Sequence, residues 1–87
     1  MTGFDGKFVI VLDHLADRYG PASLPVSVVR ETREGDGEIG QYDGGPPTLV
    51  SLNDYTATPG GEARLVDVRT GEELPARLYR LEARTDG

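Results

Sequence analysis

The chain has 87 residues and a formal net charge of −6 at pH 7, with nine Lys and Arg against fifteen Asp and Glu. Its length predicts one domain spanning residues 1–87, and its acidity argues against nucleic-acid binding, which depends on clustered Lys and Arg. The sequence contains no cysteine, which excludes disulfide scaffolds and thiolate metal sites.

No segment of the sequence is expected to enter a membrane. The longest apolar run, Phe8–Leu12, has five residues, whereas a membrane span needs roughly 20. The first residues also lack the basic and apolar segments of a signal peptide. We therefore expect a cytoplasmic protein, or a component of a particle assembled in the cytoplasm.

In chain order, the first expected element is a buried strand at Lys7–Leu12, where β-branched and aromatic residues follow one another. A short helix is expected over residues 13–19. Asp13 is a suitable N-cap for this helix, and Gly20-Pro21 is a stop signal.

The middle of the chain begins with an expected strand at Leu24–Glu31, in which Val26 and Val28 share a face. Residues 32–47 are rich in Gly, Asp and Glu, which predicts a flexible acidic surface loop. The alternative is a hairpin with a short strand around Glu38–Tyr42.

The last part of the chain has the clearest β pattern. Strands are expected at Thr48–Leu52, Ala63–Val68 and Leu74–Leu81. Residues 56–61, which include Pro59-Gly60-Gly61, are expected to form a loop. Gly71 can supply a left-handed residue for a tight turn, so the last two strands predict a β-hairpin. Residues 84–87 are expected to be a frayed tail.

Together these elements predict a mainly β fold: a small single-domain β-sandwich or barrel of five to six strands, with one short helix near residues 13–19. The alternative is an α+β fold in which the helix packs on an antiparallel sheet. Residues 49–81 resemble immunoglobulin-like accessory modules in having a strand, an Asn-Asp corner and a strand-turn-strand unit. That resemblance rests on generic sandwich features and implies no function.

The candidate catalytic residues are His14, Asp13 and Asp17, because one histidine between two carboxylates can act as an acid–base pair. No nucleophile or set of metal ligands accompanies them, so an exposed structural role is favoured. Residues 35–40 match the letters of a dinucleotide-binding motif, but the residues that follow cannot begin the helix that the motif requires. No cofactor and no metal site is expected.

The candidate binding residues are aromatic residues in or beside the loops, loop acids, and arginines of the hairpin. They are Tyr42, Tyr55, Asp36, Glu38, Asp43, Arg77 and Arg80. Tyrosines anchor interfaces and stack on sugars. Acids and arginines on one small surface suit association with a partner of complementary charge.

The sequence therefore predicts a non-enzymatic protein-interaction or assembly module that acts by surface complementarity. Its expected partner is another protein or a second copy of the chain, not nucleic acid or a membrane, and a small ligand stays open. One alternative is a ligand-binding accessory module, for instance for carbohydrate. Another is a small multimeric enzyme that uses His14 with a neighbouring Asp.

Overall fold

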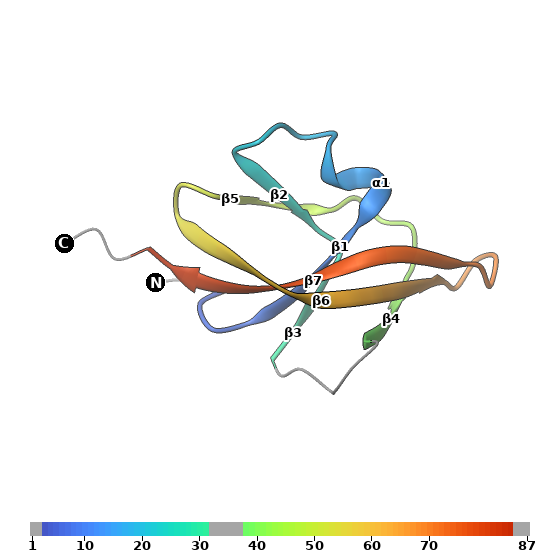
Figure 1. Cartoon of the computed structure of the whole chain (residues 1–87). Helices are drawn as coiled ribbons and strands as arrows, with labels where there is room; N and C mark the ends of the chain where they lie inside the picture. Colours follow the sequence, from blue (N-terminus) through green and yellow to red (C-terminus); the bar gives the residue numbers. More distant parts are fainter. Residues whose placement is uncertain (1–2, 32–37, 85–87) are drawn as a thin grey trace.

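The computed structural model describes residues 3–31 and 38–84, and β-strands dominate this part of the chain (Figure 1). In chain order the elements are β1 (Phe8–Leu12), α1 (Asp13–Ala16), β2 (Ser23–Val26), β3 (Val28–Arg30), β4 (Glu38–Tyr42), β5 (Thr48–Ser51), β6 (Tyr55–Asp67) and β7 (Glu73–Ala83). The prediction of a mainly β fold with one short helix is confirmed.

Five strands form one sheet in the order β3-β1-β7-β6-β4, and β2 pairs with β5 in a second sheet. All pairs are antiparallel except β4 with β6, which run parallel. The larger sheet curls until its two edge strands approach each other, and Arg30 Nη2 on β3 donates to the carbonyl of Ile39 on β4 at 2.9 Å. This sheet is therefore a nearly closed barrel.

The second sheet covers one side of the barrel and creates a second core. The inner cluster, which fills the barrel, consists of Ile10, Leu12, Leu15, Ala63, Leu65, Ala76 and Leu78. The outer cluster, which lies under β2 and β5, consists of Val9, Val11, Leu24, Val26, Val50 and Leu81. Alternate residues of a strand point to opposite faces. The five consecutive apolar residues of β1 therefore serve both clusters, and β1 is paired on both sides, with β3 and with β7.

The strand expected at Leu24–Glu31 is divided by Ser27 into β2 and β3, which belong to different sheets. Val26 packs in the outer cluster, whereas Val28 packs against the inner cluster. The chain therefore passes around the edge of β1 at Ser27, whose backbone N–H donates to the carbonyl of Ile10 at 2.9 Å. This division accounts for seven strands in the described residues where five to six were expected.

The helix is shorter than the expected 13–19. It ends at Ala16, and its N-cap is Leu12, with no side-chain capping bond. The expectation that Asp13 caps the helix is therefore wrong, because Asp13 is already the first helical residue. Buried Leu15 joins the inner cluster and so holds this single turn against the barrel.

The loop expected at residues 56–61 is also wrong, because these residues lie within β6. Pro59 pairs with Tyr79 and Gly61 with Leu78, so Gly60 is an extra residue that forms a β-bulge. One extra residue reverses which face the odd-numbered side chains occupy. As a result, Ala57 packs against the outer cluster and Leu65 lies in the inner cluster.

Within the expected acidic loop 32–47, Glu38–Tyr42 forms β4, as the alternative interpretation proposed, but this strand pairs with β6 and not in a local hairpin. Residues 32–37 lie outside the described residues. Gly40 of β4 is buried, and a Cβ there would lie 2.9 Å from Leu65 Cδ2. Glycine thus allows β4 to approach the inner cluster closely.

The predicted C-terminal hairpin is confirmed as β6 and β7, the longest strands of the fold. Its turn closes with a hydrogen bond from the Gly71 N–H to the carbonyl of Asp67, at 2.7 Å, and Gly71 has a φ of 78°. This is the left-handed conformation expected of a turn glycine. None of the helices in the described ranges is both long and apolar enough to cross a membrane.

Candidate functional site

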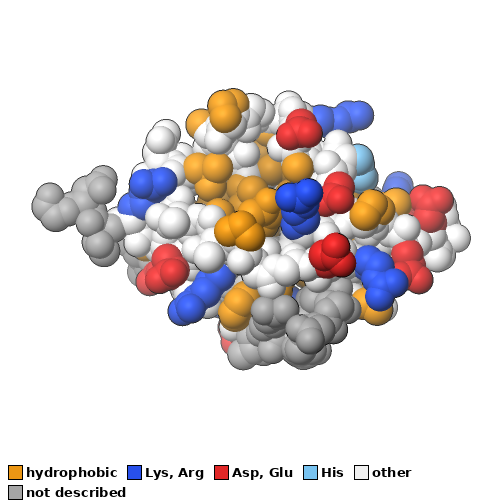
Figure 2. All heavy atoms as spheres, viewed as in Figure 1, with side chains coloured by type: hydrophobic (Ala, Val, Ile, Leu, Met, Phe, Trp, Pro, Cys, Tyr) orange, Lys and Arg blue, Asp and Glu red, His pale blue; other side chains and the backbone are white. Residues whose placement is uncertain are grey.

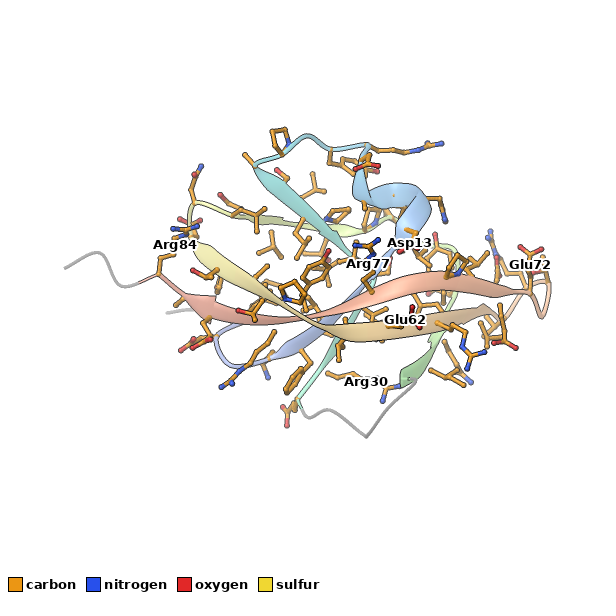
Figure 3. All side chains as sticks on the ribbon, in the orientation of Figure 1. Asp13, Arg30, Glu62, Glu72, Arg77 and Arg84 are labelled. Carbon is orange, nitrogen blue, oxygen red and sulfur yellow. The ribbon has the colours of Figure 1, made fainter. Side chains whose placement is uncertain are left out.

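Three charged side chains meet where α1 lies beside the hairpin. Arg77 of β7 pairs across the sheet with Glu62 of β6, and its Nε lies 3.7 Å from Oδ1 of Asp13. Arg77 also pairs with Val11 of β1, and Asp13, the first residue of α1, follows Val11 by two residues. Figure 3 shows Asp13, Glu62 and Arg77 gathered on this face.

Two hollows adjoin this group. The first, which we call the hairpin hollow, has a volume of about 580 Å³ and lies over β6 and β7. It is lined by Asp13, Glu62, Ala63, Arg64, Glu73, Leu74, Pro75, Ala76 and Arg77. The second, the α1 hollow, has a volume of about 450 Å³. It is lined by Asp13, Ala16, Asp17, Gly20, Pro21, Ser23, Leu24, Leu52, Arg77 and Tyr79.

The hairpin hollow has exposed, mutually paired charges. Arg64 Nη1 lies 3.2 Å from Glu73 Oε1, and both side chains are more than half exposed. The side chain of Arg77 is 69% exposed and that of Asp13 is 43% exposed. Ion pairs between solvated side chains contribute about 0–1 kcal/mol. A bound partner could therefore rearrange these pairs at little cost.

The α1 hollow has an apolar wall, because it opens onto the edge of the outer cluster. Leu24 belongs to that cluster, and Ala16, Leu52 and Tyr79 pack against it while staying partly exposed. Figure 2 shows hydrophobic side chains gathered on this face between the two-stranded sheet and the hairpin, with acidic and basic side chains beside them. Apolar and charged side chains therefore lie side by side in the α1 hollow.

The sequence-predicted catalytic residues are only partly brought together. Asp13 and Asp17 both line the α1 hollow. His14 is exposed on α1 and lines neither hollow. Neither of these hollows therefore adjoins the imidazole that the enzymatic alternative requires.

The two predicted tyrosine anchors pack against the cores. Tyr55 packs against the outer cluster, and its ring meets that of Phe4 edge-on, with centroids 5.8 Å apart. Tyr42 packs against the inner cluster and, with Asp43, lines a third hollow of about 270 Å³. The carboxylate of Asp43 also accepts a hydrogen bond from the backbone N–H of Gly45, at 2.9 Å.

The remaining predicted binding residues are dispersed. Arg77 and Arg80 lie on opposite faces of β7, since they are an odd number of residues apart in a regular strand. Glu38 is the first residue of β4. Asp36 lies outside the described residues. Of the predicted binding residues that the structure describes, only Arg77 borders the hairpin hollow and the α1 hollow.

Sequence reasoning missed Glu62 and Tyr79 as members of this surface. Tyr79 stands on the predicted strand Leu74–Leu81, whereas Glu62 precedes the predicted strand Ala63–Val68. Extending that strand by one residue would have placed Glu62 opposite Arg77. The depression beside Tyr79 had no comparable signal, because it arises between β7 and residues of α1, β2 and the turn after β5.

Sequence reasoning also missed a carboxylate at the hairpin tip. Asp67 is buried, and its oxygens accept hydrogen bonds from Arg69 Nε at 3.1 Å, from Arg69 Nη2 at 2.9 Å and from the Arg69 backbone N–H at 2.9 Å. The side-chain bonds from Arg69, followed by the backbone bond, lower the pKa of Asp67, and the same pairing raises the pKa of Arg69. This pair orders the turn.

Among residues 3–31 and 38–84, no group of three or more His, Asp or Glu side chains is arranged to hold a metal ion. Comparison of the chain with protein-family models, with curated proteins and with solved structures finds no match in any of the three.

Proposed function

We propose that this protein is a non-enzymatic protein-interaction module that binds a segment of its partner across the hairpin hollow and the α1 hollow. The observation that carries the proposal is that the two hollows share Asp13 and Arg77. Two hollows that each combine apolar and charged side chains are therefore neighbouring parts of one surface. Protein interfaces commonly combine a few apolar anchor sites with a polar rim.

The size of the surface supports this function. Each hollow lies within the range of roughly 300–1,000 Å³ that is typical of ligand clefts, at about 580 and 450 Å³. Their charged side chains are largely exposed, so an occupant would remain partly solvated. Such open, adjoining depressions fit successive side chains of a polypeptide better than one enclosed small molecule.

The two alternatives have less support. An enzyme based on His14 needs a substrate cavity beside the imidazole, and His14 lines neither of the two larger hollows. Carbohydrate binding through Tyr42 and Tyr55 needs exposed ring faces, and both rings are partly buried against the cores.

A peptide library that makes no assumption about charge tests the proposed function. Peptides displayed on phage are selected on the full chain, and the enriched peptides are then measured against Arg77→Ala and Arg80→Ala. We expect Arg77→Ala to change the affinity about threefold or more, because Arg77 borders both hollows. Loss of its charge weakens binding of an acidic peptide and strengthens binding of a cationic one. Arg80→Ala should leave binding unchanged, because it removes the same side chain from the opposite face of β7.

Amide chemical shifts of the two variants without peptide establish that both keep the fold. Failure to enrich any peptide contradicts the proposed function. So does an equal change of affinity in Arg77→Ala and Arg80→Ala, since the binding surface would then lie elsewhere.

A further inference from the structure

The charged side chains around the two hollows are acidic in excess. Six such side chains line them: Asp13, Asp17, Glu62, Glu73, Arg64 and Arg77. Both arginines already form ion pairs, Arg77 with Asp13 at 3.7 Å and Arg64 with Glu73 at 3.2 Å. Asp17 and Glu62 form no salt bridge with another described residue. Two carboxylates on this surface are therefore able to pair with cations of a partner.

One of these two carboxylates lines the α1 hollow, and the other lines the adjoining hairpin hollow. Asp17 lines the α1 hollow together with Leu52 and Tyr79. Glu62 lines the hairpin hollow and stands opposite Arg77, which borders both hollows. A side chain seated in the α1 hollow thus has Asp17 beside it, and the residues that follow it along a bound segment reach Glu62 in the adjoining hairpin hollow. Lys and Arg can lay their aliphatic stems on such apolar surface while their charged ends stay in water.

The charge of the whole chain argues against a second copy as the occupant. Each copy has a net charge of −6, and association of two strongly acidic surfaces is opposed by repulsion. A cationic segment is attracted by both the local excess of acids and the overall charge. Its approach is also accelerated by that attraction.

We infer that the partner of the proposed interaction module presents a segment in which Lys or Arg flanks an aliphatic or aromatic residue. The apolar residue occupies the α1 hollow, and the flanking cations pair with Asp17 and Glu62. This inference rests on the function proposed above and adds the chemical class of the partner.

Three matched peptides test the inference: acetyl-Lys-Leu-Lys-Leu-Lys-amide, its Glu-Leu counterpart and its Lys-Ser counterpart. Each is titrated into the full chain while backbone amide shifts are recorded. We expect the Lys-Leu peptide to bind most tightly and to shift the residues lining the two hollows. Affinity should fall as salt is added, because solvated ion pairs are screened.

Glu62→Gln should weaken binding of the Lys-Leu peptide about threefold, as expected for loss of one exposed ion pair. Glu72→Gln is the matched control, since it removes the same charge at the far end of the hairpin (Figure 3). Equal effects of the two substitutions overturn the inference.

The inference and the proposed function fail in different ways. If the Glu-Leu peptide binds the hollows as tightly as the Lys-Leu peptide, the surface binds peptides but the partner class is wrong. If the Lys-Leu peptide does not bind, the inference is also overturned. The library selection then decides the proposed function separately, because it presumes no charge.

Discussion

At the scale of single residues, Asp67 shows how one carboxylate can organise a turn. It lies at the end of β6 and is one of the few polar residues buried in the described structure. Three hydrogen bonds from Arg69 replace the hydrogen bonds to water that the Asp67 carboxylate loses on burial. The hairpin tip is therefore held by charge as well as by the conformation of Gly71.

Asp67→Asn should lower stability, and the difference from the wild type should depend on pH. Because Arg69 lowers the folded-state pKa of Asp67, its contribution is fully present above the unfolded pKa of about 3.9. That contribution is lost as the pH falls through the folded pKa. Urea unfolding at a series of pH values from about 7 to 3 should show the two proteins converging at low pH.

Asp54→Asn is the control for this experiment. Asp54 is exposed, and its described hydrogen bonds involve only its backbone. The Asp67 interpretation would be wrong if both substitutions changed stability equally at every pH.

At the scale of elements, the bulge in β6 decides which side chains reach each core. Residues before Gly60 contribute Tyr55 and Ala57 to the outer cluster, whereas residues after it contribute Ala63 and Leu65 to the inner cluster. A regular strand would send one of these two sets to the wrong face. The bulge thus allows one strand to serve two cores.

Deletion of Gly60 should therefore prevent formation of the native fold. Exposing Leu65 alone costs about 1.5–3 kcal/mol, a large share of the stability of a small domain, and misplacing Ala63 adds to that cost. Amide shift dispersion and the urea midpoint measure the effect.

Gly60→Ala keeps the register and is the matched control for the deletion. Its Cβ would lie in ordinary contact with Leu78, at 3.4 Å from Cδ2. We expect a loss of at most about 1 kcal/mol, typical of a surface substitution without a special conformation. A deletion variant with native stability would contradict the role assigned to the bulge.

At the scale of the whole molecule, the net charge of −6 affects the oligomeric state of the free protein. Repulsion between copies disfavours self-association. We expect light scattering to give a mass near 9.4 kDa at both low and high salt. A closed oligomer at both salt concentrations would instead favour self-assembly as the function. The interacting surface would then lie between copies of the chain and not at the two hollows.

The sequence by itself determined the β class and the C-terminal hairpin. In both, the decisive forces act between neighbours: β-branched residues favour extended backbone, and Gly71 supplies the left-handed turn that lets two strands pair. The candidate site was predicted only at Asp13, Asp17 and Arg77, since charged residues can be noted one at a time without knowledge of their neighbours.

Only the tertiary structure decided how these pieces combine. The division at Ser27, the parallel pairing of β4 with β6 and the bulge at Gly60 depend on which core each side chain can reach. The β propensity of a residue does not reveal which core its side chain will reach, because burial against residues distant in the sequence outweighs propensity. The two hollows have the same origin: they lie between elements far apart in sequence, so their shape exists only once both cores have packed.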